Sequence, residues 1–138
     1  MIDMDMVSVN HEITAQLARS AVRASTNLPV KYVVLDTKTG RTGRYLAAFR
    51  GRKTVMAVCY RLHAQRILAL SYGVVPILRT QELSDKYHFL VDALEFIDQY
   101  RKLQDDDLMA IVGGSFGPDG GASYLELADV RGIRRRNE

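Results

Sequence analysis

Residues 36–44 combine the residue types that hold phosphate groups: hydroxyls, cations and glycines, placed just ahead of a stretch with helical spacing. The first N–H groups of a helix and its partial positive charge attract anions, and threonine hydroxyls and a lysine add further donors. We therefore expect a phosphate site formed by Thr37, Lys38, Thr39, Gly40, Arg41 and Thr42. The alternative is a helix cap at Thr39 with solvated cations. The lysine precedes the glycine, so this is not a Walker loop.

A second loop, residues 113–123, holds five glycines within positions 113–121. Glycine allows positive φ angles and close approach of the backbone to a ligand. A tight connection between antiparallel strands would need only one or two glycines. The surplus favours a binding loop in which Gly120 and Gly121 present their backbone N–H groups to a ligand.

The same loop contains Gly113-x-Ser115-x-Gly117, the pattern of the nucleophile elbow in serine hydrolases. That elbow leads from a strand into a helix, whereas here a proline, an aspartate, two glycines and then a strand follow. The histidine of such a triad must also come after the serine, and the last histidine of this chain is His88. The pattern does not predict a hydrolase.

Other reactive residue types are scattered. His11, His63 and His88 lie far apart on helical stretches, and residues 105–107, three aspartates, read as a solvated turn. Cys59 is the single cysteine and is interpreted as a small apolar filler near the pocket. No acid, base and orienting group come together, so we predict no catalytic residue, no metal site and no cofactor.

Alternating strands and helices position these loops. Apolar periodicity and helix or turn signals predict the elements in this order. They are a helix from Asn10 to Asn27, a strand over Val30–Asp36, a short helix over Thr42–Phe49, a strand over Thr54–Val58, a helix over Arg61–Tyr72, a strand over Val74–Leu78, a helix over Asp85–Leu103, and strands over Leu108–Val112 and Ser123–Ala128.

This pattern is typical of an α/β fold, a three-layer αβα arrangement with a five-stranded, mostly parallel sheet. The right-handed crossover rule favours the strand order 3-2-1-4-5. The last connection is too short for a parallel crossover, so the fifth strand is expected to run antiparallel at the edge. Ligands bind such sheets where the winding reverses, beyond the carboxyl ends of strands one and four. The two loops described above leave those two strands.

Length and composition place the chain among ordinary globular proteins. Its 138 residues suit one domain, and hydrophobic residues make up 47% of it. The lone cysteine favours the cytoplasm. The longest charge-free apolar stretch, residues 67–78, is too short to cross a bilayer. The N-terminus lacks the features of a signal peptide, so no membrane is expected as a partner.

The net charge of +3 lies entirely in residues 131–138, which hold four arginines and one glutamate. We predict a domain over residues 1–130 and a basic, solvated C-terminal tail over residues 131–138. A basic tail on a neutral body is weak support for polyanion binding, so nucleic acid is not an expected partner.

Tyr32–Leu78 resembles the C-terminal domain of pyruvate kinase. The likeness runs through the loop Thr37-Lys38-Thr39-Gly40-Arg41-Thr42 and the segment Tyr72-Gly73-Val74-Val75-Pro76. It returns at Asp106–Gly114 and at Gly120–Leu125. About 110 residues are covered, which is most of the chain.

The resemblance implies a regulatory rather than a catalytic role. In that family the metal ions and phosphoryl transfer belong to a separate barrel domain, so we expect no kinase activity from this chain alone. The resemblance implies subunit contacts in a homo-oligomer and an effector site for fructose 1,6-bisphosphate or another sugar phosphate. The loop matching residues 37–42 would take one phosphate, and residues 117–123 would close over the effector.

Two alternatives remain at this point. The chain is an assembly module whose pocket is vestigial, or it is a small-molecule enzyme that uses the same pocket. The second alternative needs a general base near the loops, for which Asp36 and Asp119 are the candidates.

Overall fold

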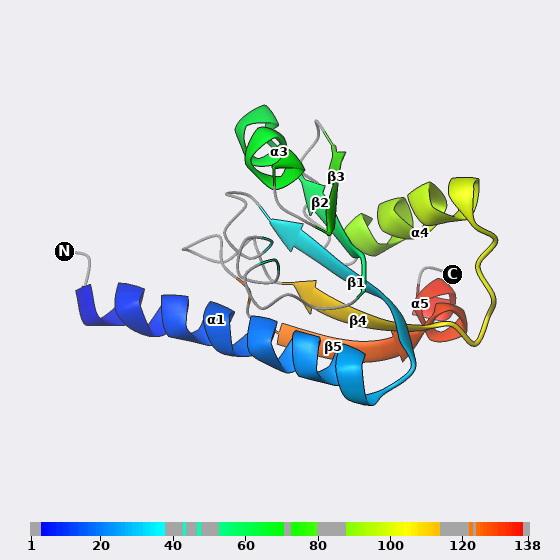
Figure 1. Cartoon of the computed structure of the whole chain (residues 1–138), viewed down its shortest axis with the longest axis horizontal. Coiled ribbons are helices and arrows are strands. Elements are labelled where there is room, and N and C mark those ends of the chain that lie inside the picture. The colour runs from blue at the N-terminus through cyan, green and yellow to red at the C-terminus, as the bar shows by residue number, and fades with distance from the viewer. Residues whose placement is uncertain are drawn as a thin grey trace.

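The structure, a computed structural model, describes residues 4–37, 43, 47, 53–70, 73–79, 88–113, 122 and 124–136. In chain order the elements are α1 (Met4–Asn27), β1 (Val30–Thr37), β2 (Val55–Cys59), α3 (Leu62–Ala69), β3 (Val74–Leu78), α4 (His88–Tyr100), β4 (Leu108–Gly113), β5 (Tyr124–Asp129) and α5 (Val130–Arg136) (Figure 1). Of the short helix expected over 42–49, only Gly43 and Ala47 are described, and both are helical.

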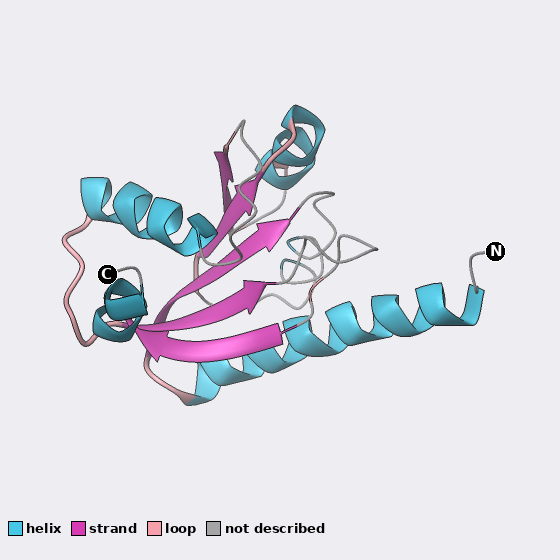
Figure 2. Cartoon of the chain, turned by 180° about the vertical axis from the view of Figure 1, so that it is seen from behind, coloured by secondary structure: helices cyan, strands magenta, loops and turns pink. Residues whose placement is uncertain are grey.

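The strands form one five-stranded sheet in the order β3-β2-β1-β4-β5. Neighbouring strands are parallel except β4 and β5, which are antiparallel. The arrowheads of β1, β2 and β4 accordingly point to the same end of the sheet, and that of β5 points the opposite way (Figure 2). The fold class and strand order predicted from the sequence are confirmed.

β1 lies at the centre of the sheet and is buried on both faces because alternate side chains enter two separate cores. Val33 and Leu35 join the core beneath α1 and α3, which is completed by small residues such as Ala18 and Ala64. The opposite face of β1 joins a second core beneath α4 and α5. This is the three-layer arrangement in which helices cover both faces of a parallel sheet.

α1 is longer than the sequence predicts. It ends at Asn27 as expected, just before the Leu28-Pro29 step, but it begins at Met4 rather than at Asn10. Residues 4–9 contain neither glycine nor proline, so nothing in their composition stops the helix before Asn10. The N-terminal part of α1 extends past the sheet (Figure 1). The structure describes no helix long and apolar enough to cross a membrane.

The C-terminal segment differs from the predicted solvated tail. Residues 130–136 form α5, in which Val130 and Ile133 are fully buried in the core beneath α4. The N–H of Gly132 donates to Oδ1 of Asp129 over 2.7 Å and so caps the first turn. This helix was not predicted from the sequence because the segment is rich in arginine. A helix this short needs only two apolar residues to bury one face.

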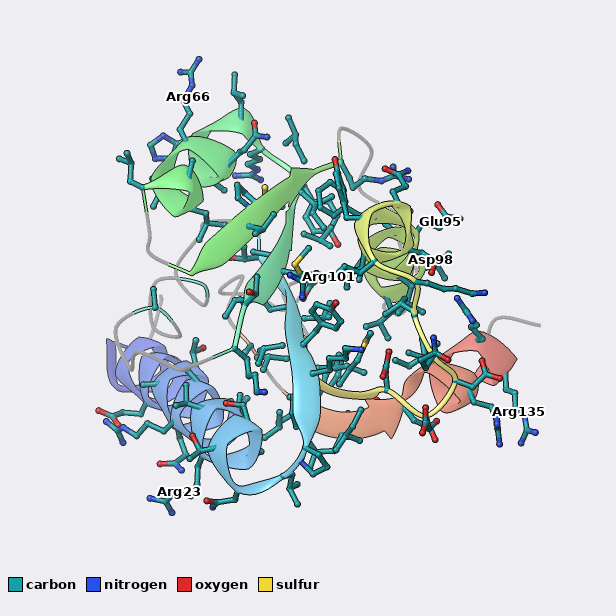
Figure 3. All side chains as sticks on the ribbon, turned by 45° about the vertical axis from the view of Figure 1, so that its right-hand side comes forward. Arg23, Arg66, Glu95, Asp98, Arg101 and Arg135 are labelled. Atoms are coloured by element: carbon teal, nitrogen blue, oxygen red, sulfur yellow. The ribbon has the colours of Figure 1, made fainter. Side chains whose placement is uncertain are left out.

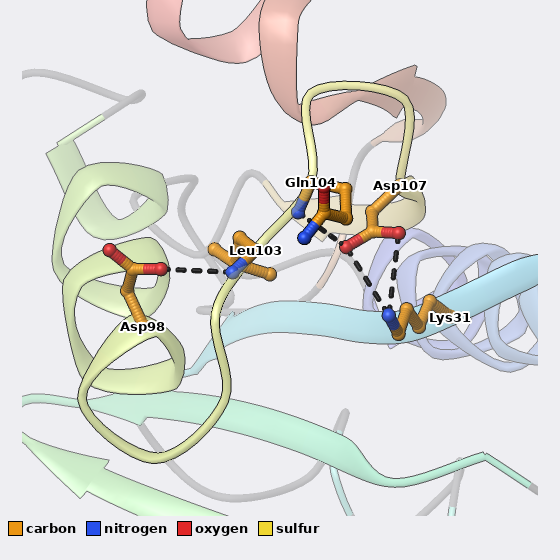
Figure 4. A network of polar contacts seen from close by, with 5 residues as sticks. All are labelled: Lys31, Asp98, Leu103, Gln104 and Asp107. Atoms are coloured by element: carbon orange, nitrogen blue, oxygen red, sulfur yellow. Dashed lines mark hydrogen bonds and ion pairs between the residues drawn. The ribbon is translucent and has the colours of Figure 1, made fainter.

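Polar contacts fix the amino ends of β1 and β4. Lys31 Nζ lies 3.4 Å from both carboxylate oxygens of Asp107, and Oδ2 of Asp107 also accepts the N–H of Gln104 over 2.9 Å (Figure 4). Asp98 accepts the N–H of Leu103 where the chain leaves α4. Two of the three aspartates predicted to form a solvated turn therefore also connect elements: Asp107 contacts Lys31 of β1, and Asp105 lies 3.8 Å from Arg131 of α5.

Candidate functional site

The carboxyl ends of β1, β2 and β4 meet at one edge of the sheet. Thr37 is the last residue of β1, is fully buried, and lies opposite Cys59, the last residue of β2. On the other side, Leu35 lies opposite Val112, one residue before the end of β4. The two loops predicted to bind a ligand therefore leave adjacent strands at the point where the sheet winding reverses, where open α/β sheets bind their ligands.

Thr37 is the single predicted site residue that the structure describes. Lys38, Thr39, Gly40, Arg41 and Thr42 lie outside the described residues, as do Gly120 and Gly121. The structure thus shows the strand end from which the first loop leaves, and the assignment of a phosphate to that loop stays a prediction.

Gly43 follows the predicted phosphate loop and packs against α3. A Cβ atom built on Gly43 would lie 2.5 Å from Cδ2 of Leu68, which is fully buried. Any larger residue at this position would displace that side chain. Gly43 itself is therefore in direct contact with α3, and this packing rather than a ligand explains the glycine.

Gly113, the first glycine of the second loop, also has a packing reason. It pairs across the sheet with Tyr124, and a Cβ on Gly113 would meet the Tyr124 hydroxyl and ring. The tyrosine ring lies over the space that a side chain would occupy. Of the five glycines counted in this loop, one is thus required by the fold. Tyr124 was not singled out from the sequence, although an aromatic residue directly after a glycine-rich turn is a usable signal.

Cys59 is confirmed as a filler. It is fully buried, and its Sγ lies 3.6 Å from the carbonyl oxygen of Ile77, to which the thiol donates. Burial raises the pKa of the thiol to about 11, while a hydrogen bond to its own backbone acts in the opposite direction. A buried thiol with a raised pKa carries little thiolate at neutral pH, and thiolate is the nucleophilic form.

Asp36, one of the two candidate bases, is 3% exposed. By strand alternation it shares the face of β1 that carries Tyr32 and Val34, which pack beneath α4. Thr37 faces the opposite side, beneath α1 and α3. The carboxylate and the threonine hydroxyl are therefore directed to different faces at the same strand end. Asp119, the other candidate base, lies outside the described residues.

Metal-binding groups were not expected, and the described ranges contain no cluster of three or more His, Cys, Asp or Glu side chains that could hold a metal ion. His63 lies exposed on α3. The side chains of His11 and His88 fall outside the described part of the structure.

The fold defines a class: a three-layer α/β domain with the sheet order 3-2-1-4-5 and an antiparallel edge strand, in which the carboxyl ends of β1 and β4 lie side by side. The chain belongs to the family of the pyruvate kinase alpha/beta domain, whose family model matches residues 15–128.

Individual relatives agree with this assignment. The chain is 28% identical over 116 residues to the pyruvate kinase of Lactobacillus delbrueckii subsp. bulgaricus, covering 83% of this chain and 20% of that protein. It is 23% identical over 128 residues to the pyruvate kinase of Thermococcus litoralis, covering 92% of this chain and 26% of that protein. The chain therefore spans about a fifth to a quarter of the length of these relatives.

A solved structure shares the fold. The crystal structure of Cryptosporidium parvum pyruvate kinase superimposes with a TM-score of 0.73 at 18% identity, covering 86% of this chain and 22% of that protein. At this level of identity the match establishes the architecture alone.

Proposed function

We propose that this domain binds a phosphorylated metabolite of the effector type, such as fructose 1,6-bisphosphate, at the carboxyl edge of β1 and β4. The observation that carries the proposal is the position of Thr37: it ends the central strand next to the end of β4, in a domain of the pyruvate kinase family. A loop of three hydroxyls and a lysine then begins at the sheet position that ligands favour. On this view the chain regulates and carries no kinase activity by itself.

The packing on either side of the loop supports the proposal. Cys59 and Thr37 are fully buried, so the strand ends form a rigid base. Gly43, one residue after the predicted loop, packs against Leu68 of α3. Because the residues that flank the predicted loop are packed, less conformational entropy is lost when a ligand binds between them.

Calorimetric titration at low salt tests this function. The panel is fructose 1,6-bisphosphate, glucose 6-phosphate, ribose 5-phosphate, AMP and sulfate. We expect saturable binding of one sugar phosphate, well above sulfate. Thr39→Glu should weaken it roughly tenfold or more, because a carboxylate in the loop repels phosphate.

The matched control is Gln99→Glu, which adds the same charge on an exposed position of α4. It should leave the affinity unchanged. Equal affinity for the panel members and sulfate, or an unaltered affinity in Thr39→Glu, would contradict the site.

A second role, assembly of copies of this chain, is favoured by the edge of the sheet. β5 is the last strand on its side, and Leu127 on it is 42% exposed. An open strand edge offers N–H and C=O groups to a second copy. α1 lies beside β5, and its N-terminal part projects past the sheet (Figure 1). We propose that this edge and α1 form the subunit contact.

Sedimentation across a concentration series tests the contact. Leu127→Lys should shift the equilibrium toward monomer, since it places a charge at the edge. Leu70→Lys is the matched control, because Leu70 is 90% exposed at the end of α3, which packs near the opposite edge of the sheet. A monomer at all concentrations, or equal effects of the two variants, would refute the contact. An oligomer that binds none of the phosphates would leave assembly as the sole role.

A further inference from the structure

A cavity of about 310 Å³ lies beneath α4, at the opposite ends of the strands from the phosphate loop. Its floor is formed by residues near the amino ends of three neighbouring strands: Tyr32 of β1, Met56 of β2 and Val75 of β3. Pockets for small molecules begin at about this volume. Since the strands separate it from the carboxyl edge, it is a site distinct from the one proposed above.

The roof of the cavity is aromatic. Phe96, Ile97 and Tyr100 line it from the last turns of α4, and the rings of Phe96 and Tyr100 lie 5.1 Å apart at an angle of 51°. Tyr100 is 73% exposed, so one ring of the pair stands at the mouth. Two tilted rings over aliphatic walls suit a third aromatic ring, which can stack on one and meet the edge of the other.

The phenol of Tyr32 is a polar group on an apolar floor. The side chain is 6% exposed, and its hydroxyl has no hydrogen-bond partner among the described residues. A buried hydroxyl without a partner is unfavourable, and in native proteins it calls for a reason such as a bound molecule. The hydroxyl itself has almost no exposed surface, so a polar atom of a ligand on the floor satisfies it once a small rotation of the side chain turns it toward the cavity.

A cation stands at the cavity wall. Arg101 directly follows α4, lines the cavity, and makes no ion pair with any residue that the structure describes. Figure 3 shows it lying between α4 and the strands. The other charged side chains labelled on α4 in that view, Glu95 and Asp98, do not line this cavity. The site therefore attracts an anion, and the planar guanidinium matches a carboxylate.

We propose that this cavity binds a single-ring aromatic carboxylate with a polar group para to the acid-bearing side chain. The ring lies under Phe96 and Tyr100, the carboxylate pairs with Arg101, and the para group hydrogen-bonds the Tyr32 hydroxyl. A cavity of about 150 Å³ holds benzene, so 310 Å³ accommodates a ring with a short chain. A sugar phosphate is too polar for these apolar walls. The two proposed sites therefore bind different classes of ligand.

Amide shifts of the isotope-labelled chain, followed during titration with para-hydroxyphenylpropionate, test the site. We expect saturable shifts at Tyr32, Val75 and Phe96. Two analogues each remove one contact: phenylpropionate lacks the para hydroxyl, and para-hydroxyphenylpropionamide lacks the charge. Each should bind about tenfold more weakly, as expected for the loss of one hydrogen bond or ion pair in a partly desolvated site.

Variants assign each contact to a residue. Arg101→Gln should weaken the carboxylate about tenfold and leave the amide analogue unchanged. Tyr32→Phe removes only an unbonded hydroxyl, so the fold should persist, and the preference for the para-hydroxyl compound should vanish. Arg135→Gln makes the same charge change on exposed α5, away from the cavity, and is the control.

Absence of saturable shifts, or equal weakening in Arg101→Gln and Arg135→Gln, would overturn the inference. Shifts confined to Thr37 and Gly113 would also overturn it, because they would place the compound at the carboxyl edge. A negative result for this cavity would not contradict the proposed phosphate site, because that site is tested with other ligands and with its own variant, Thr39→Glu.

Discussion

At the scale of single residues, Gly113 and Tyr124 show how the chain closes the carboxyl edge of the sheet. They are directly opposed across β4 and β5, and the tyrosine ring occupies the position of a missing side chain. The ring also packs partly against the core beneath α4. A residue with a Cβ at 113 would push this ring toward solvent and loosen the base of the glycine-rich loop.

Gly113→Ala should therefore destabilise the domain by about 1–3 kcal/mol, the usual cost of overpacking a filled site. Denaturation in urea, followed by circular dichroism, gives the free energy of unfolding. In the Tyr124→Ala background the same change should cost nothing or be slightly favourable, because alanine restricts the unfolded chain more than glycine does. An equal loss in both backgrounds would mean that the ring is not the obstacle.

Cys59 gives a pH dependence with a defined sign. Burial raises the pKa of its thiol from 9.0 to about 11. Between these values the unfolded chain has released the proton and the folded chain retains it, so the free energy of unfolding falls as the pH rises. Below pH 9 both states are protonated and the thiol adds no pH dependence.

The comparison is between the natural chain and Cys59→Ala, unfolded by urea at about pH 8 and about pH 10.5. Alanine removes the titrating group, so the variant should lose less stability over this interval. Tyrosines and lysines titrate equally in both proteins and cancel. Parallel losses in the two proteins would show that the thiol is not buried as described.

At the scale of elements, α5 completes the core that α4 begins. Val130 and Ile133 are fully buried there, and the backbone N–H groups of Val130 and Arg131 donate to the carbonyls of Asp107 and Asp105 over 3.0 and 2.9 Å. α4 is tied to the sheet by an ion pair of 2.7 Å between Arg79 and Asp92. These contacts hold both helices over the same face.

Ile133→Ala should cost about 2–5 kcal/mol, as is typical when a fully buried isoleucine is truncated. Arg135→Ala, two residues further along the same helix and exposed, should change the free energy of unfolding by less than about 0.5 kcal/mol. Thermal and urea unfolding of both variants provide the measurement. An unchanged free energy of unfolding in Ile133→Ala would mean that this segment is a solvated tail, as its charge suggested.

The strands and long helices could be predicted because their apolar periodicity is strong. The sequence predicts a strand over Val30–Asp36 that is buried on both faces, and β1 is such a strand, one residue longer. Short elements were harder. α5 carries its two buried residues among arginines, and the start of α1 lacks a stop signal that would mark it. Tertiary packing makes the first segment helical despite its charge, and α1 continues toward the N-terminus because no residue there stops it.

At the scale of the whole molecule, the strand order brings together the strand ends from which the two predicted binding loops leave. Thr37 and Gly113 are far apart in sequence and lie on neighbouring strands because the chain crosses back to place β4 beside β1. This part of the site follows from topology and was predictable. The cavity beneath α4 was not, since the strand and helix patterns around Tyr32 and Tyr100 indicate core packing and carry no sign of a gap.

The family places this domain in proteins about four to five times longer, among them the pyruvate kinases of Lactobacillus and Thermococcus. A domain of this class offers two opposite ends of one sheet, and we propose a different ligand chemistry for each: phosphate at the carboxyl edge and an aromatic carboxylate at the amino edge. The central claim is the first of these.

The most direct test of that claim is a titration of the isotope-labelled chain with fructose 1,6-bisphosphate at low salt, followed residue by residue through amide shifts. We expect saturable shifts at Thr37, Cys59 and Gly113, no shifts at Tyr100 and Arg101, and far weaker binding of sulfate. Absence of saturable shifts, or shifts centred on Arg101, would contradict it.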